Sequence, residues 1–449
     1  MKKEYLWVSL LVVISFLIRV YRLNTPPSYM FDEVYHAFTA EAYAKNDPRG
    51  YEWWHKAPEG FAYEWLHPPL AKLIQAGSIK ILGDTAFAWR FPGTVFAAAI
   101  VALLYFFGKS LFNPFVGLVA AFLYAFDGLS FVQSRITMND TYVTFFLVLA
   151  FYFFWQHVQG QRRLIWLGLA LGLAASTKWT GFYAIPILAG LWLINILRTK
   201  NLKPRTLFIG AWSFFIIPSV IYFLSFSQFW LQGHTWSQFK ELHNQIWWYQ
   251  TNLKATHPYQ SAAWTWPFLH RPVWYYVNYG ENTIANIYAM GNPAIWWAGI
   301  VAIGWTMIVL VGRVAEVARQ QFLSKSNRSL KEEKLYRGDS LKDSEKIGRA
   351  PRDLLALVII FLGYFGFFLP WVFSPRIMFL YHYLPSIPFM CLALGYGLDR
   401  LWQNPKLKIL VSCYLLSVIL LFLYFYPHLS ALAVPKWLSE TYFWFPSWR

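Results

Sequence analysis

Apolar runs separated by short polar stretches dominate this chain of 449 residues. A helix needs about 20 apolar residues to cross the hydrocarbon core of a membrane, and about 11 runs approach that length. We predict spans at 5–20, 88–107, 115–132, 141–157, 163–177, 180–197, 206–229, 294–312, 354–373, 379–400 and 408–426. The pattern therefore indicates an all-α integral membrane protein with about 11 transmembrane helices.

The first run, after the basic start MKKEY, allows two interpretations: a cleaved signal peptide or a retained anchor. It lacks a small-residue cleavage site and further spans follow, which favours the anchor. With the N-terminus inside, the inner loops hold more than half of the Lys and Arg residues, as the positive-inside rule requires. We therefore predict the N-terminus inside and the C-terminus outside.

Three segments of the single polytopic domain 1–449 are too long to be simple turns. Segment 21–87 is the first outer loop, and 230–293 is the second. Segment 313–353 is polar and mixed in charge, which predicts a partly disordered cytoplasmic linker that touches anionic lipid. Within the first outer loop, LHPPLAKLIQAGSIKILG predicts a helix lying along the membrane surface, with an apolar face of Leu70, Leu73, Ile74 and Gly77.

The second outer loop is rich in tryptophan. Its indole side chains belong to Trp230, Trp236, Trp247, Trp248, Trp264, Trp266 and Trp274. One interpretation is an aromatic belt at the membrane interface. The other is a wall that binds a lipid-linked or sugar ligand, and the sequence does not choose between them.

Composition supports the membrane assignment. Hydrophobic residues make up 57% of the chain and charged residues 14%, against about 25% charged in soluble domains. The formal net charge of +17 therefore reflects basic inner loops rather than a nucleic-acid partner. Cys391 and Cys413 lie inside apolar runs and indicate neither a disulfide framework nor a metal site.

Charged and polar residues at span ends and in outer loops point to one face. They are Asp32, Glu33, His36, His67, Lys72, Arg90, Asp127, Arg135, Asp140, Lys178, Arg376 and His382. Such groups are costly near a membrane unless they have a task. A carboxylate can act as a general base, and Arg or Lys can bind phosphate. The set therefore suggests group transfer from a phosphate-linked lipid donor.

Structural explanations compete with these roles. The Asp32–Glu33 pair also suits an N-cap and first-turn acid for the helix EVYHAFTAEAYAK. Arg90 could extend its charged end to the membrane surface, and Arg135 and Asp140 could form a surface ion pair. His67, which precedes two prolines, could be a turn residue.

Several motifs resemble those of a known family. They are FDEVYHAFTAEAYAK, EWLHPPLAKLIQAG, WRFPG, FVQSRITMNDTYVTFF, GLAASTKWTGFYAI and SPRIMFLYHYLPSIPF. In this order they resemble the protein O-mannosyltransferases, which use dolichyl- or polyprenyl-phosphate mannose. The resemblance implies a GT-C fold and inverting transfer of mannose to Ser or Thr hydroxyls of exported proteins. Segment 230–293 is too short for the β-trefoil insertion of eukaryotic members, so the chain looks like the bacterial form.

The resemblance also implies roles for individual residues. Asp32 corresponds to the base, and Glu33 to its partner in binding acceptor or sugar. Arg90 matches an arginine that handles the carrier phosphate. The remaining matches, expected to bind substrate, are His67, Lys72, Arg135, Asp140, Lys178, Arg376, Tyr381 and His382.

Two rival functions remain. A GT-C enzyme can use a lipid or cell-wall glycan as acceptor, although the full motif set favours protein. A transporter or flippase is disfavoured, because its charges would lie near the midplane and repeats would be expected.

We expect a plasma-membrane enzyme with its site on the outer side, acting on polyprenyl-phosphate mannose and exported protein, with no nucleic-acid partner. An association with the secretion machinery is a further expectation. No spacing forms a metal-ligand signature, so we assign no metal site and no cofactor. Carboxylates and histidines share the outer face, which leaves a metal requirement open.

Overall fold

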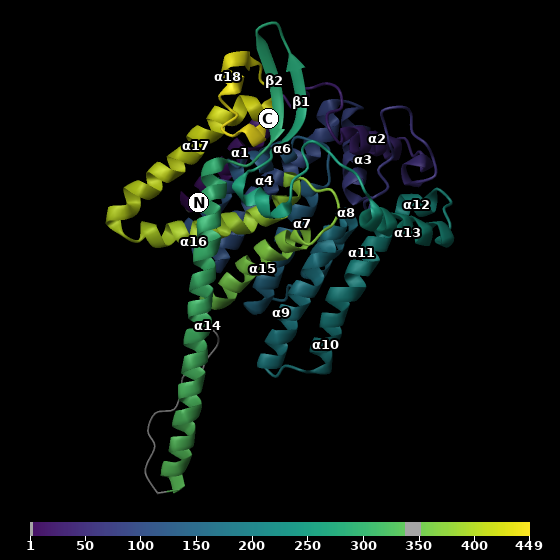
Figure 1. The fold of residues 1–449 in the computed structure, drawn as a ribbon. Helices are drawn as coiled ribbons and strands as arrows, with labels where there is room; N and C mark the ends of the chain where they lie inside the picture. Colours follow the sequence, from purple (N-terminus) through teal and green to yellow (C-terminus); the bar gives the residue numbers. More distant parts are fainter. Residues whose placement is uncertain (1–2, 337–351) are drawn as a thin grey trace.

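The computed structural model describes residues 3–336 and 352–449, and most of that chain is helical (Figure 1). Long apolar helices form the body of the molecule. They are α1 (Lys3–Val20), α4 (Ala86–Leu111), α5 (Pro114–Ala125), α7 (Asp140–Val158), α8 (Leu164–Thr177), α9 (Ala184–Arg198), α10 (Pro204–Ala211), α11 (Ile217–Ser225), α14 (Pro293–Tyr336), α15 (Arg352–Val372), α16 (Ile387–Trp402) and α17 (Lys408–Ser430). A π-helical turn, η3 (Trp212–Ile216), joins α10 to α11, and the 3-10 turns η6 (Pro405–Leu407) and η7 (Pro446–Trp448) lie near the C-terminus.

Seven helices among the described residues are long and apolar enough to cross a membrane. They cover 86–111, 140–158, 179–198, 204–225, 293–319, 353–372 and 405–430. The shorter helices α5 and α8 are also apolar. Helical residues occupy every predicted span, and the chain is a multi-pass membrane protein. The number of spans and the orientation stay predictions.

The predicted span 115–132 is divided at Asp127. Helix α5 ends at Ala125, and the short helix α6 (Gly128–Gln133) follows. The Asp127 carboxylate accepts a hydrogen bond from the Ser130 N–H at 2.9 Å, which caps α6. It also accepts one from Trp296 Nε1 at 2.7 Å, which ties α6 to α14. This buried acid therefore has a structural role.

The first outer segment folds onto one end of the bundle. It contains α2 (Glu33–Ala44), η1 (Pro48–Tyr51) and α3 (Leu70–Leu82). Figure 1 shows α2 and α3 near the same end as the β-hairpin and α18 (Lys436–Glu440), while the turn between α9 and α10 lies at the other end. Elements of segments 21–87 and 230–293 thus lie toward the same end of the bundle, and the assignment of that end to the outer side stays a prediction.

Helix α3 follows the two prolines as predicted, and it packs against α2 and α4. Leu70, Leu73 and Ile74 are only half-buried. The buried residues are Ala71, Lys72, Gln75, Ala76 and Ile79. The helix lies where the sequence predicts it, and its position relative to the membrane surface stays a prediction. The packed face carries Lys72 and Gln75, buried polar residues with partners inside the protein.

The second outer segment contains strands as well as helices. It begins with α12 (Ser227–Leu231), α13 (Trp236–Asn252) and η4 (Ala263–Phe268), and then forms the antiparallel hairpin of β1 (Val273–Tyr279) and β2 (Thr283–Ala289). Strand β3 (Val434–Pro435) extends the sheet in the order β1-β2-β3. Aromatic and β-branched residues in VWYYVNY favour this strand. The fold is mostly helical, as predicted, with a small sheet that the sequence pattern did not predict.

Helix α14 continues far beyond the apolar run that begins it. It spans 44 residues, so the predicted linker is helical as far as Tyr336. Figure 1 shows this helix projecting from the bundle. Ala, Glu, Lys, Arg and Gln, which are frequent here, are good helix formers. The rest of the predicted linker, 337–351, lies outside the described residues.

Helices α4 and α5 approach each other through two glycines. A Cβ atom at Gly117 would lie 2.3 Å from the Tyr105 carbonyl oxygen, and one at Gly108 would lie 2.7 Å from the Gly117 Cα. Small residues allow membrane helices to pack with their backbones close together. This contact holds the α4–α5 hairpin in the centre of the bundle.

We predict that Gly117→Ala destabilises the protein by about 1–3 kcal/mol, because the added methyl forces the two helices apart. The melting temperature of the purified protein in detergent measures this. Gly190→Ala is the matched control in α9, since its Cβ meets no atom within 4 Å. Equal melting temperatures for the two variants would contradict the packing argument.

Candidate active site

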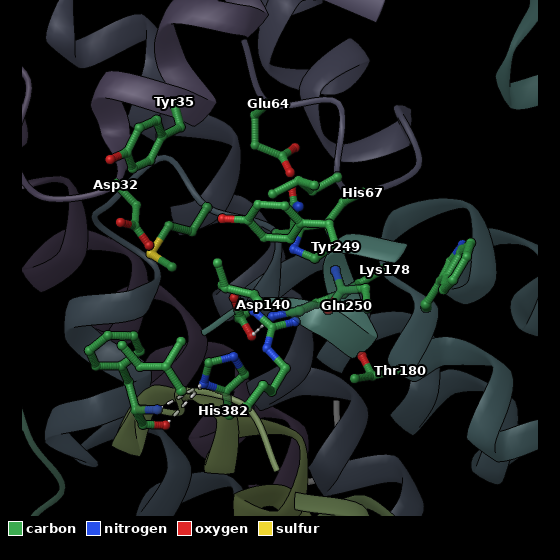
Figure 2. A pocket seen from close by; sticks show the side chains of 18 of the residues that line it. Asp32, Tyr35, Glu64, His67, Asp140, Lys178, Thr180, Tyr249, Gln250 and His382 are labelled. Atoms are coloured by element: carbon green, nitrogen blue, oxygen red, sulfur yellow. Dashed lines mark hydrogen bonds and ion pairs between the residues drawn. The ribbon is translucent and has the colours of Figure 1, made fainter. Parts of the chain in front are cut away.

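A cavity of about 900 Å³ opens where the start of α2, the segment before α3, the C-terminal end of α13 and η5 (Leu380–Ser386) meet. Figure 2 shows side chains from these separate elements turned toward a common space. The predicted site residues that line it are Asp32, His67, Asp140, Lys178, Arg376, Tyr381 and His382. The other predicted residues, Glu33, Lys72, Arg90 and Arg135, do not line it.

Asp32 occupies the N-cap position of α2 but does not cap the helix with its side chain. Its Oδ2 instead accepts a hydrogen bond from the Tyr381 hydroxyl at 3.4 Å. Phe31, just before it, has a left-handed backbone with φ 47 and stacks on Tyr275 with 4.3 Å between ring centroids. This fixed turn directs the Asp32 carboxylate into the cavity.

Burial raises the pKa of Asp32 to about 7. The Tyr381 hydrogen bond and the Lys178 charge favour the ionised carboxylate, whereas the Asp140 and Glu64 charges disfavour it. A group whose pKa lies near the working pH can both accept and release a proton. Asp32 therefore has the electrostatics expected of a general base.

Glu33 points away from the cavity and is fully buried. Its carboxylate accepts hydrogen bonds from Arg90 Nε at 2.8 Å and Nη2 at 2.6 Å, and from the Thr137 N–H at 3.0 Å. Arg90 also donates to the carbonyl oxygens of Leu23, Pro26 and Ser28. Since these bonds use the whole guanidinium group, Arg90 fixes the loop instead of facing the place where a phosphate would enter.

Lys72 and Arg135 also serve the scaffold. The Lys72 ammonium is buried and forms an ion pair with Glu64. Arg135 donates to the carbonyl oxygens of Arg19, Tyr21 and Arg22 at and beyond the end of α1. Helix ends leave carbonyl groups without partners, and Arg135 satisfies them. The geometry gives neither residue direct access to a substrate.

Positive charge in the cavity comes from Lys178 and Arg376. Lys178 follows α8 and precedes the turn η2 (Trp179–Tyr183), and its Nζ lies 2.8 Å from Asp140 Oδ1. Arg376 lies in the segment before η5, and its Nε has no hydrogen-bond partner among the described residues. Arg376 is thus the lining cation best placed to bind an anionic ligand, with Lys178 beside it.

Several lining residues were not among the predicted site residues. Glu64 lies inside the motif EWLHPPLAKLIQAG, so a sequence signal for it existed. His36 was named in the outer-face set but was given no role. Tyr35, Tyr249 and Gln250 also line the cavity, and Tyr249 and Gln250 come from the end of α13. Burial, with the Lys72 and Lys178 charges, holds the pKa of His36 and His67 well below its usual range, so both rings are neutral.

The tryptophans of the second outer segment divide between the two interpretations. Trp247 lines the cavity. Trp248 and Trp264 are exposed, as expected for an interfacial belt, while Trp266 is fully buried. The segment therefore contributes an aromatic side chain to the cavity as well as surface aromatic residues, and binding of a ligand there stays a prediction.

Within residues 3–336 and 352–449, no group of three or more His, Cys, Asp or Glu side chains is arranged to hold a metal ion. The prediction of no metal site and no cofactor stays a prediction, and the metal requirement stays open.

Two family descriptions match consecutive parts of this chain. The family described as dolichyl-phosphate-mannose-protein mannosyltransferase matches residues 9–232. The C-terminal four TMM region of protein-O-mannosyltransferase matches residues 235–448.

Curated relatives agree. The polyprenol-phosphate-mannose–protein mannosyltransferase of Mycolicibacterium smegmatis is 24% identical over 462 residues, covering 86% of this chain and 82% of the relative. That of Corynebacterium glutamicum is 23% identical over 466 residues, covering 86% and 81%. Dolichyl-phosphate-mannose–protein mannosyltransferase 1 of Saccharomyces cerevisiae is 31% identical over 163 residues, 36% of this chain and 17% of the relative.

Solved structures share the fold. The S. cerevisiae Pmt1-Pmt2 complex bound to the sugar donor superposes with a TM-score of 0.78 at 17% identity, covering 100% of this chain and 93% of that chain. ArnT from Cupriavidus metallidurans bound to undecaprenyl phosphate gives 0.60 at 14% identity, covering 90% and 62%.

Fold and site together define a membrane-embedded glycosyltransferase of the GT-C class. The chain belongs to the protein O-mannosyltransferase family, and the resemblance noted in the sequence is confirmed.

We predict that Glu33→Gln lowers the stability of the protein by about 3–5 kcal/mol, because it leaves the buried Arg90 charge without its counter-charge. A thermal unfolding curve of the purified variant measures this loss, and Glu59→Gln on the exposed part of the same segment is the control. A Glu33→Gln protein that melts like the wild type while losing only transfer activity would show that Glu33 acts on substrate instead.

Proposed function

We propose that this protein transfers mannose from polyprenyl-phosphate mannose to Ser or Thr hydroxyls of exported proteins, with Asp32 as the general base. The observation that carries the proposal is the division of the acidic pair: Glu33 is neutralised by Arg90, while Asp32 faces the cavity with a pKa of about 7. The names of the curated relatives support the donor and the protein acceptor.

The reaction is a single displacement. The acceptor hydroxyl oxygen attacks the anomeric carbon, and Asp32 takes the hydroxyl proton as the new bond forms. The bond between the anomeric carbon and the phosphate oxygen breaks on the opposite side, and its electron pair leaves with the polyprenyl phosphate. The anomeric centre is therefore inverted.

Charge develops on the departing phosphate, and cations already in place stabilise it. Arg376 supplies a guanidinium group whose Nε is unpartnered among the described residues. Lys178 supplies a second positive charge, oriented by Asp140. In this proposal the base is Asp32, beside Tyr381, and the phosphate binds near Arg376 in the same cavity.

The prenyl chain would lie among the apolar helices, so the donor enters from the lipid. We place the cavity on the outer side of the plasma membrane, in line with the charge distribution of the loops. Acceptor chains would then reach it as they leave the secretion machinery, with which we expect an association.

Asp32→Asn is expected to lower transfer by about 10²- to 10⁴-fold, because the amide cannot take the hydroxyl proton. The assay follows labelled mannose from polyprenyl-phosphate mannose to a Ser/Thr peptide, and a peptide with Ala at those positions is the acceptor control. Asp47→Asn, which alters the exposed pair with Arg49 in the same outer segment, is the matched protein control. Wild-type transfer by Asp32→Asn would rule out Asp32 as the base, and transfer to the Ala peptide would rule out a Ser/Thr acceptor.

The pH dependence follows from the raised pKa of Asp32. The base must be ionised, so kcat/KM should rise with pH through about 7 and then level off. Tyr381→Phe removes a hydrogen bond that favours the ionised form, so its midpoint should shift to higher pH. An unshifted midpoint, or one shifted to lower pH, would contradict the contact between Tyr381 and Asp32.

A further inference from the structure

One wall of the cavity contains buried polar atoms that lack partners among the described residues. They are Glu64 Oε1, His36 Nδ1 and His67 Nδ1. All three residues line the cavity. Figure 2 shows Glu64 and His67 on a different side of the space from Asp32. Buried polar atoms in folded proteins almost always have hydrogen-bond partners. A cluster of unpaired polar atoms on the wall of a cavity therefore indicates that a bound ligand supplies the missing hydrogen bonds.

The Glu64 side chain is held in place from behind. Its backbone N–H donates to Thr39 Oγ1 at 2.7 Å, and Thr39 Oγ1 donates to the Tyr35 carbonyl at 2.7 Å. These two bonds fix the segment around Glu64 on α2. Lys72 binds Glu64 Oε2 and also donates to the His67 carbonyl at 3.1 Å. Glu64 Oε2 is therefore bonded to Lys72, and Glu64 Oε1 has no hydrogen-bond partner among the described residues.

The two histidines stand beside this carboxylate. His36 Nδ1 lies 3.8 Å from Glu64 Oε2, which is beyond hydrogen-bonding distance. The His36 and His67 rings are stacked with 6.3 Å between their centroids. Both rings are neutral, so each has one nitrogen that accepts and one that donates. The wall thus offers a carboxylate oxygen that accepts hydrogen bonds and two neutral imidazoles.

This combination selects the kind of group that binds. A phosphate would be repelled by the Glu64 carboxylate, whose partner Lys72 is already used in their ion pair. Lys178 and Arg376 line the same cavity and can serve as the phosphate's counter-charges. An apolar prenyl chain would leave the polar atoms unsatisfied. Hydroxyl groups suit the wall, because they donate to a carboxylate in a charge-assisted bond and accept from an imidazole.

We propose that Glu64, positioned by Lys72, and the neighbouring His36 and His67 form the subsite that binds the sugar hydroxyls of the donor. The inference rests on the proposed function, because it takes the sugar to arrive on a lipid phosphate. It gives Lys72 a positioning role, through Glu64, in place of direct contact with substrate.

The test compares two ligands that differ only in the sugar: a short-chain polyprenyl-phosphate mannose and the same polyprenyl phosphate without mannose. Binding to the full-length purified protein is measured without acceptor, so no chemistry is required. Glu64→Gln is expected to weaken binding of the mannosylated ligand by about 10- to 100-fold and to leave binding of the bare phosphate unweakened. Glu41→Gln, which removes a carboxylate from α2 away from the cavity, should change neither affinity.

A structural role for Glu64 would weaken binding of both ligands alike, and that result would overturn the proposal, as would unchanged binding of both. If Glu64→Gln fails to fold with Lys72 unpaired, Glu64→Gln combined with Lys72→Met removes both buried charges and is held to the same comparison. Wild-type protein that binds neither ligand would instead refute the proposed function, which keeps the two failures distinct.

Discussion

Two buried guanidinium groups hold the chain where it leaves the first helix, and the cavity depends on them. Arg135 donates to the carbonyls of Arg19 and Tyr21, and Arg90 donates to those of Leu23, Pro26 and Ser28. Backbone carbonyls without partners are costly in an apolar setting. The ion pair of Arg90 with Glu33 completes this anchor and fixes the next residue back, Asp32, against the bundle.

The anchor explains why adjacent acids have different fates. Successive side chains at the start of a helix point about 100° apart, because the helix has 3.6 residues per turn. Glu33 is therefore directed into the protein, where it forms an ion pair with Arg90, while Asp32 is directed into the cavity. The same cavity is lined by Asp32, by Glu64 and by the cations Lys178 and Arg376. In the proposed reaction these groups would serve the base, the sugar and the phosphate respectively.

Much of this was accessible from the sequence. Apolar runs located the helices, and the motifs located the cavity, since they contain Asp32, His67, Asp140, Lys178, Arg376, Tyr381 and His382, which all line it. What the sequence did not give is direction. Lys72, Arg90 and Arg135 share their residue type with Lys178 and Arg376, yet the first three are turned inward to partners inside the protein. Arg90 and Arg135 bind carbonyls that lie far away along the chain, and Lys72 binds Glu64 and the His67 carbonyl just before it. The β-hairpin was missed because its strands follow a tryptophan-rich stretch without clear alternation, and Glu64 was missed because its importance depends on the Lys72 contact across the two prolines.

The central claim is that Asp32 deprotonates the acceptor and never bonds to the sugar. The anomeric configuration of the product, determined by NMR on a peptide mannosylated by the purified enzyme, tests this most directly. The account predicts a configuration opposite to that of the polyprenyl-phosphate mannose supplied. A retained configuration would imply two successive displacements with a covalent intermediate, and would contradict the role assigned to Asp32.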